Sequence, residues 1–319
     1  MSAIETIGVD LGGTKLLAGV LDGERRVLWE SREVSTGHAE GDLVELIARE
    51  IAEARAARPA ASAVGVGVPA TMDQRSGTAV GAVNLPIEDL PIRDLLAERA
   101  GLPVTVDNDA NLAMLAEHLH GAARGTSNAL MITIGTGIGG GVIIGGELYR
   151  GTTGAGAELG HVVLDLDGEP CQGNCPGKGH AETLASGTAL GREGRAAAER
   201  SPDSAIGRLA AQGVTIDGKA VTTAAIAGDE EARSVVRMVG QRIGLLLSGL
   251  ANIFEPEVMV VGGGVIAAGE LLLEPAREIV REQTLRPMNE TEVVAAELGP
   301  DAGMIGAAAM ARTGLQREG

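Results

Sequence analysis

Four side chains that can bind a metal lie between residues 154 and 187. This stretch contains both cysteines of the chain and two of its five histidines, and the potential ligands are His161, Cys171, Cys175 and His180. Two thiolates and two imidazoles form a donor set that suits tetrahedral zinc. The glycine residues between them allow a short loop to fold back on itself. We therefore expect a structural zinc site; the alternative is two ordinary thiols and two surface histidines.

Glycine-rich turns follow three of the predicted strands. They are Gly12-Gly13-Thr14-Lys15, Gly135-Thr136-Gly137-Ile138-Gly139-Gly140 and Gly262-Gly263-Gly264. Glycine lets backbone N–H groups approach a phosphate without hindrance from a Cβ atom, and the hydroxyls of Thr14 and Thr136 add donors. The first two turns are therefore expected to bind phosphate, and the third suits a flat nucleoside base packed against bare backbone.

Two familiar nucleotide-binding patterns do not account for these turns. The Walker pattern is absent because Thr14 interrupts its glycine–lysine pair. The spacing of Gly135, Gly137 and Gly140 matches the dinucleotide fingerprint, but residues 141–144 predict a strand where the fingerprint needs a helix. The more informative signal is that two such hairpins open two similar halves of the chain.

Asp10 closes the first predicted strand beside the first glycine turn. An Asp in that place commonly caps the turn. The phosphate-binding turns favour another role, in which Asp10 holds Mg²⁺ through water, because this ion keeps much of its hydration shell.

Asp107-Asn108-Asp109 lies where a predicted strand is followed by a helix, at the carboxyl edge of a sheet where ligands usually bind. An Asp at such a junction is often a helix cap. The functional alternative is a general base, Asp109, which accepts a proton from an attacking hydroxyl. A helix N-terminus favours the charged carboxylate and weakens the base, but phosphoryl transfer depends mostly on positioning and charge stabilisation.

The elements that position these residues follow from hydrophobic periodicity. Strands are expected at residues 4–10, 15–21, 26–34, 63–68, 104–106, 129–134, 142–144, 161–164, 257–261 and 293–296. The longer helices are expected at residues 43–57, 92–100, 110–119, 230–254, 269–282 and 303–311. Each half begins with a strand, a glycine turn and a return strand, and later alternates helix and strand. This pattern predicts a duplicated α/β fold of two lobes with a central cleft.

The predicted division places residues 1–118 in a small lobe, to which a C-terminal helix at 303–319 returns. Residues 119–302 form a large lobe that carries the zinc loop. Acidic residues outnumber basic ones 43 to 26, and the resulting charge of −17 argues against nucleic acid or an anionic membrane as the main partner.

No targeting or membrane segment is expected. The N-terminal residues lack the basic and apolar regions of a signal peptide. Residues 125–146 are uncharged, but their eight glycines predict a hairpin rather than a membrane span. Two cysteines do not make a disulfide framework, so we expect a cytoplasmic protein.

Six motifs in order resemble the ROK family of sugar kinases and sugar-responsive repressors. They are residues 10–15, 108–111, 135–140, 156–161, Glu182 with residues 186–187, and residues 301–303 with 306–308. The resemblance extends from about residue 4 to residue 312. It implies an actin- and hexokinase-like (ribonuclease H-like) fold whose two lobes close on ATP and a hexose, with Mg²⁺.

The resemblance also implies roles for individual residues. Asp109 would take the proton of the sugar 6-hydroxyl, and the sugar hydroxyls would be bound by Asn84, Asn108, Glu158, His161 and Glu182. His161 would place one ring nitrogen on zinc and the other toward a hydroxyl. The expected activity is a glucokinase that works as a homodimer or homotetramer. The alternatives are a kinase for fructose, mannose, N-acetylglucosamine or N-acetylmannosamine, and a non-catalytic sugar-sensing regulator.

Three departures from the family pattern affect this interpretation. The family usually has Cys-x-Cys-Gly and a third Cys, whereas here Cys171 and Cys175 are separated by three residues and His180 takes the third position. Ala70 stands where glycine is more usual and is expected to tighten the sugar pocket. Asp10 lies so near the start that we expect no DNA-binding domain before it.

Overall fold

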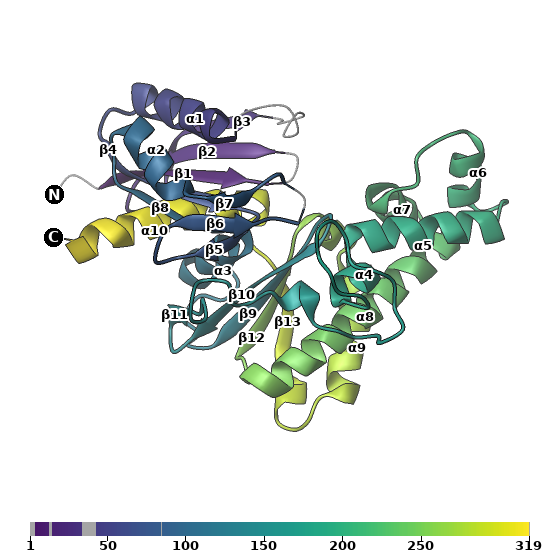
Figure 1. The fold of residues 1–319 in the computed structure, drawn as a ribbon. Helices are drawn as coiled ribbons and strands as arrows, with labels where there is room; N and C mark the ends of the chain where they lie inside the picture. The colour runs from purple at the N-terminus through teal and green to yellow at the C-terminus, as the bar shows by residue number, and fades with distance from the viewer. Residues whose placement is uncertain (1–3, 13–14, 34–42, 84, 319) are drawn as a thin grey trace. The chain divides into compact units, whose positions relative to one another are not determined.

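The computed structural model describes residues 4–12, 15–33, 43–83 and 85–318 and divides into two compact units (Figure 1). Unit 1 comprises Met1–Gly121, Leu148–Ala157 and Leu298–Gly319, and unit 2 comprises Ala122–Glu147 and Glu158–Glu297. The sequence-based division assigned residues 148–157 to the large lobe. In the structure they lie with unit 1, where the Gln74 backbone N–H donates to the Thr153 carbonyl at 2.8 Å.

The sheet of unit 1 has five strands in the order β3-β2-β1-β4-β8. They are β1 (Glu5–Leu11), β2 (Leu16–Leu21), β3 (Val27–Glu33), β4 (Ala61–Val68) and β8 (Val104–Asn108). Strand β2 is antiparallel to both of its neighbours, β1 and β3, whereas β1, β4 and β8 run parallel. Strands β1 and β4 are apolar and rich in β-branched residues, which favours a central buried position.

The two faces of this sheet are covered by different helices. Ile7 and Val9 point into a core that also contains Val44 and Ile47 of α1 (Leu43–Ala57), and all four are buried. On the alternate positions, a Cβ atom on Gly8 would overlap the Met304 carbonyl, so only glycine lets α10 (Ala302–Glu318) lie this close. Figure 1 shows α10, in yellow, alongside these N-terminal strands. Helix α10 therefore packs against strands from the N-terminal part of the chain.

Unit 1 also contains two further helices and a small sheet. The helices are α2 (Ile92–Ala100) and α3 (Asp109–His120), and a small sheet contains β5 (Thr71–Asp73), β6 (Thr78–Gly81) and β7 (Glu88–Leu90). The small sheet was not predicted from the sequence, because strands of three or four residues are too short to show an alternating pattern.

The sheet of unit 2 has the order β11-β10-β9-β12-β13. Its strands are β9 (Ala129–Ile134), β10 (Ile138–Ile144), β11 (Glu147–Leu148), β12 (Val258–Gly262) and β13 (Glu292–Ala295). Strand β10 is antiparallel to β9, while β9, β12 and β13 run parallel. The predicted duplication is thus present as a repeated sheet topology, and the α/β fold class is confirmed by the solved structures compared below.

The helices of unit 2 are α4 (Ala181–Ala185), α5 (Gly187–Arg200), α6 (Ala205–Ala211), α7 (Gly218–Ile226), α8 (Glu230–Phe254) and α9 (Glu270–Gln283). Helices α8 and α9 pack at glycine positions, since a Cβ on Gly244 would come within 2.6 Å of the Ala276 carbonyl oxygen. Among the described residues, no helix has the length and apolar character needed to cross a membrane.

The strand predicted at residues 161–164 is wrong. Residues Leu159–His161 form a 3₁₀ turn, and Val163 makes only an isolated bridge to His180. Val162 and Val163 are 39% and 51% exposed, so their apolar side chains do not form the buried face of a sheet. The segment is held by backbone bonds, with the N–H groups of Leu164 and Asp165 both donating to the Gly179 carbonyl.

Candidate functional site

Asp10 lies near the end of β1, against two glycine residues of unit 1. It is paired with Gly67 of β4 in the parallel register, and a Cβ on Gly303 of α10 would lie 2.5 Å from its Oδ2. Burial raises the pKa of the Asp10 carboxyl to about 7, and the negative charge of Asp109 adds to the shift. Two carboxylates that repel each other in a partly buried place form a site that a cation would stabilise.

Asp109 is the first residue of α3, directly after the end of β8. The helix is capped by its neighbour Asn108, whose Oδ1 accepts from the N–H groups of Ala110 at 2.9 Å and Asn111 at 3.2 Å. The Asn108 amide nitrogen donates to the Ala70 carbonyl at 3.3 Å. The cap predicted for this junction therefore falls mainly to Asn108, whose oxygen is committed to the helix.

Asp107, the residue before Asn108, has a fully buried side chain that hydrogen-bonds to the same junction. Its Oδ1 accepts from the Asn108 N–H at 2.8 Å and from the Asn111 amide at 3.1 Å. Its Oδ2 accepts from Arg150 Nε at 2.6 Å. Arg150 was not predicted to be a functional residue, because no motif connects it with residues 107–109.

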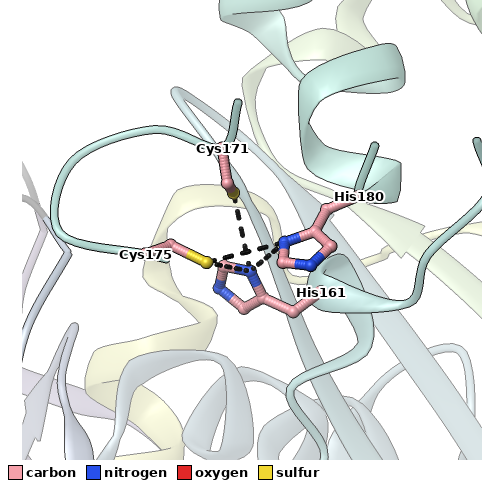
Figure 2. A group of neighbouring side chains, drawn as sticks. All are labelled: His161, Cys171, Cys175 and His180. Atoms are coloured by element: carbon pink, nitrogen blue, oxygen red, sulfur yellow. Dashed lines mark hydrogen bonds between the residues drawn. The ribbon is translucent and has the colours of Figure 1, made fainter. Parts of the chain in front are cut away.

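Figure 2 shows the four predicted ligands of unit 2 gathered around one point. The two histidines approach through Nδ1, and these nitrogens are 3.1 Å apart. Cys175 Sγ lies 3.6 Å from Nδ1 of both His161 and His180, and Cys171 Sγ lies 3.7 Å from His161 Nδ1. All four donor atoms lie within 4.8 Å of one another. The structure thus brings together residues that span 20 positions of sequence.

The N···N distance and the three S···N distances given above fit a tetrahedral metal. With metal–sulfur bonds of about 2.3 Å and metal–nitrogen bonds of about 2.0 Å, tetrahedral geometry requires N···N near about 3.3 Å and S···N near about 3.5 Å. In the protein alone, burial raises the pKa of the Cys171 thiol to about 12, with the Cys175 sulfur as the next cause. Burial also lowers the pKa of His180, and so favours the neutral imidazole that binds metals. The donor set suits Zn²⁺.

Glu182 links this cluster to the glycine turn that follows β9. Its Oε2 accepts from the Ile138 backbone N–H at 2.8 Å, and its Oε1 lies 3.8 Å from Cys171 Sγ. A Cβ atom on Gly137 would overlap the Glu182 carboxylate. Glycine is therefore required at residue 137 for a reason besides access to phosphate.

The turn at residues 135–138 is held from behind by the start of α5. The Gly187 N–H donates to the Gly135 carbonyl at 2.8 Å, and Thr188 Oγ1 donates to the Thr136 carbonyl at 2.8 Å. The Thr136 carbonyl also accepts from Gln172 Nε2 of the cysteine loop at 3.4 Å. Thr136 itself is exposed, so a rigid turn presents its hydroxyl to solvent.

The third glycine turn follows β12. Gly263 has φ of +85°, and a Cβ there would lie 2.5 Å from the backbone nitrogen of Ile134. No side chain fits this conformation and this distance. Gly263 and Gly264 are exposed, whereas Gly262 is buried at the end of β12, so bare backbone faces solvent at residues 263–264.

Three predicted site residues cannot be placed, and Lys15, Gly139 and Glu158 lie beside the groups described above. Gly13, Thr14 and Asn84 lie outside the described residues. Lys15 is exposed, and its carbonyl closes the first turn by accepting from the Gly12 N–H at 2.8 Å. Gly139 is part of β10, where it pairs with Thr133. Glu158 is exposed and directly precedes the 3₁₀ turn that carries His161.

The repeated five-stranded sheet and the solved structures reported below place the chain in the actin- and hexokinase-like class of α/β proteins. A family model described as the ROK family matches residues 6–314. The chain belongs to the ROK family. A glucokinase from Streptomyces coelicolor is 38% identical over 314 residues, which cover 96% of this chain and 97% of that protein.

Two solved structures extend the comparison. A ROK family glucokinase from Streptomyces griseus, in complex with glucose and AMPPNP, is 40% identical with a TM-score of 0.88. The match covers 97% of this chain and 99% of that one. A ROK hexokinase from Thermus thermophilus is 35% identical with a TM-score of 0.76, and the match covers 98% of this chain and all of that one.

Proposed function

We propose that this protein is an ATP- and Mg²⁺-dependent hexose kinase that transfers the γ-phosphoryl group to the 6-hydroxyl of glucose. The observation that carries the proposal is the 40% identity, over nearly the whole chain, to a glucokinase that binds glucose and AMPPNP. The paired carboxyl groups of Asp10 and Asp109 support it, because they provide a cation site beside a candidate base. Fructose, mannose, N-acetylglucosamine and N-acetylmannosamine are the alternative substrates.

In this proposal Asp109 is the catalytic residue. Its carboxylate accepts the proton of the 6-hydroxyl as the oxygen attacks the γ-phosphorus, and the bond to the bridging oxygen breaks to leave ADP. Asp10 would hold Mg²⁺ through water, and the cation would oppose the burial and the Asp109 charge that raise the pKa of the Asp10 carboxyl. The α3 N-terminus and the Asn108 cap fix where Asp109 begins the helix.

The nucleotide is assigned to the three glycine turns. Residues Gly12, Gly13, Thr14 and Lys15 of unit 1 and Gly135, Thr136, Gly137 and Gly139 of unit 2 bind its phosphates in this proposal. Gly262, Gly263 and Gly264 are assigned to the base. The rigid Thr136 turn supports this assignment, because donors that are already oriented need no reorganisation when charge develops.

The sugar is assigned to Asn84, Asn108, Glu158, His161 and Glu182. Asn108 uses its oxygen for the helix cap and one amide hydrogen for the Ala70 carbonyl, so its second amide hydrogen is assigned to a sugar hydroxyl. His161 directs Nδ1 into the ligand cluster, which leaves Nε2 for a sugar hydroxyl. Glu182 accepts from Ile138 through Oε2, so we assign Oε1 to the sugar. The same residue then contacts both the nucleotide turn and the sugar.

We also propose that His161, Cys171, Cys175 and His180 hold one structural Zn²⁺. When bound, the metal supplies a fixed tetrahedral centre and no chemistry of its own. The donor distances of 3.1–3.7 Å support this assignment. Its consequence is that His161 and Glu182 are held at one orientation toward the sugar.

The proposed setting is the cytoplasm, with a homodimer or homotetramer as the working form and no nucleic acid or membrane as partner. The net charge of −17 supports the exclusion of polyanions. Leu245 and Ile253 of α8 are 46% and 71% exposed, which favours an association surface. Sedimentation velocity of the purified chain should show a dimer or tetramer; a monomer at micromolar concentration would contradict this part.

A coupled assay of ADP release tests the main proposal. The purified chain is mixed with Mg²⁺, ATP and each of glucose, fructose, mannose, N-acetylglucosamine and N-acetylmannosamine. We expect the highest kcat/KM with glucose. Higher kcat/KM with another hexose would replace glucose as the substrate, and sugar binding without ADP release would favour the sensing regulator. No turnover with any hexose would end the kinase proposal.

A further inference from the structure

Asp107 is an acidic residue whose side chain is fully buried. Its side chain has no exposed surface, and Arg150, with 31% of its side chain exposed, is its ion-pair partner at 2.6 Å. An ionised carboxylate is tolerated at such depth only when a cation and hydrogen-bond donors compensate it. Arg150 therefore supplies the ion-pair partner of a carboxyl group that has no contact with solvent.

The other oxygen of Asp107 fixes the junction that carries Asp109. Oδ1 accepts from the backbone N–H of Asn108 and from the side-chain amide of Asn111. These two donors lie on either side of Asp109 in the chain. The bonds of one buried carboxylate thus determine where β8 ends and how α3 begins.

Arg150 belongs to a strap of unit 1, residues 148–157, that is tied to the same strand end. The Gln74 N–H donates to the Thr153 carbonyl at 2.8 Å, and Gln74 Nε2 donates to the Val106 carbonyl of β8 at 3.1 Å. The Gly156 N–H closes the strap on the Arg150 carbonyl at 2.9 Å. The strap thus holds the Arg150 backbone beside the residues that its side chain stabilises.

We propose that Arg150 is a positioning residue for phosphoryl transfer, which acts through Asp107 to hold Asp109 at the attacking hydroxyl. This role rests on the proposed function, in which Asp109 is the base. Arg150 itself touches neither the sugar nor the nucleotide in that proposal. Its loss should lower kcat by much more than it raises the KM for glucose, which Asn108 also binds in the proposal, because displacement of a catalytic group by about 1 Å costs roughly a hundredfold in rate.

Arg150→Met is the test, and Arg99→Met is its matched control. Arg99 Nε pairs with Glu45 at 2.7 Å and has a 32% exposed side chain, but Glu45 is 61% exposed. Both arginines thus form an ion pair through Nε, but only the partner of Arg150 is a fully buried acid. We expect Arg150→Met to lower kcat by about tenfold to a hundredfold, with KM for glucose and ATP within about threefold of wild type. Equal kcat in Arg150→Met and wild type, or an equal loss in Arg99→Met, would overturn the inference.

Two further variants separate positioning from a general loss of folding. Arg150→Lys should recover kcat to within about tenfold of wild type, since only Nε bonds to Asp107 and an ammonium can replace a single donor. Asp107→Asn combined with Arg150→Met should be more active than Arg150→Met alone, because the amide oxygen still accepts from Asn108 and needs no cation. Losses that multiply in the double variant would contradict the mechanism.

Hydrogen exchange gives a readout that does not depend on the reaction. Backbone amides of residues 105–113 should exchange at least about tenfold faster in Arg150→Met than in wild type, and should be unchanged in Arg99→Met. If wild type phosphorylates no hexose, the proposed function fails while this exchange difference can still be measured. Unchanged exchange at residues 105–113 in Arg150→Met would overturn the positioning role itself.

Discussion

The two sheets share one strand order but carry different chemistry at matching positions. In unit 1, Asp10 pairs with Leu17 of β2 and Gly67 of β4. In unit 2, strands β9, β10 and β12 correspond to β1, β2 and β4 of unit 1. The residue equivalent to Asp10 is Thr133 of β9, which pairs with Gly139 of β10 and Gly262 of β12. An acid in one half thus corresponds to a neutral hydroxyl in the other. The duplicated scaffold is retained, and the functional difference lies in single residues at strand ends.

The units also differ in what is inserted between equivalent strands. Between its hairpin and its next parallel strand, unit 1 has α1, whereas unit 2 has the ligand cluster and helices α4 to α8. In our proposal the catalytic acid chemistry belongs to unit 1, while unit 2 provides backbone donors and a loop that zinc would stabilise. The following experiments test that division.

Removal of the carboxylate of Asp109 in unit 1 should have the largest effect on turnover. Asp109→Asn keeps the size of the side chain but cannot accept the proton, so we expect kcat to fall by about a thousandfold. Glucose affinity by calorimetry should stay within about threefold of wild type. Asp94→Asn, on a side chain 70% exposed in the same unit, is the control and should behave as wild type. Undiminished turnover in Asp109→Asn would remove Asp109 as the base.

Removal of one of the proposed zinc-binding side chains in unit 2 should raise the KM for glucose more than it lowers kcat. We expect wild type to contain one zinc per chain and Cys175→Ser to lose it, because three donors bind the ion less well than four. The KM for glucose should rise about tenfold, since second-sphere orientation contributes about this much. Asn174→Ser, at the exposed neighbouring position, should retain zinc. Wild-type protein without zinc by metal analysis would end this interpretation.

Crowding between the nucleotide turn and the Glu182 carboxylate should have a smaller effect. A methyl group at Gly137 would meet the Glu182 carboxylate, so Gly137→Ala should displace the turn and raise the KM for ATP several-fold. Gly249 of α8 has open space where a Cβ would lie, and Gly249→Ala is the control. A KM for ATP that is the same in both variants would show that the turn tolerates the methyl group.

The other acid of unit 1, Asp10, should affect the thermal stability of the protein, and this is the smallest of the expected effects. The pKa of Asp10 is raised, so without Mg²⁺ folding favours its protonated form. Its ionisation in the unfolded chain lowers stability as pH rises from about 4 to about 7. Asp10→Asn lacks this ionisation, and its Tm should exceed that of wild type by a few degrees at pH 8. The difference should vanish near pH 4; a difference that does not change with pH would show that the raised pKa is not its cause.

Most of the fold could be predicted from the sequence where periodicity extends over many residues. Residues 43–57, 92–100 and 230–254 are helical with the expected bounds, because a long amphipathic pattern is hard to misread. Strand β10 begins at Ile138 rather than residue 142, since pairing with β9 outweighs the low strand propensity of three glycines.

The candidate site was predictable where chemistry is local in sequence. The four ligands lie close together in the chain, and their rarity draws attention to them. The Asp107–Arg150 pair was not predictable, because the fold brings together residues 43 positions apart that belong to no common pattern. The bond between Glu182 and Ile138 was missed for the same reason: it depends on tertiary packing between a helix start and a turn.

The central claim is that the chain moves a phosphoryl group from ATP to the 6-hydroxyl of glucose. Phosphorus-coupled ¹³C NMR of the product formed from ¹³C-glucose, ATP and Mg²⁺ tests it most directly. We predict that coupling to phosphorus appears at C6 and at its neighbour C5, and that 6-deoxyglucose remains unmodified. Phosphorylation at another carbon, or release of inorganic phosphate without a sugar product, would contradict the claim.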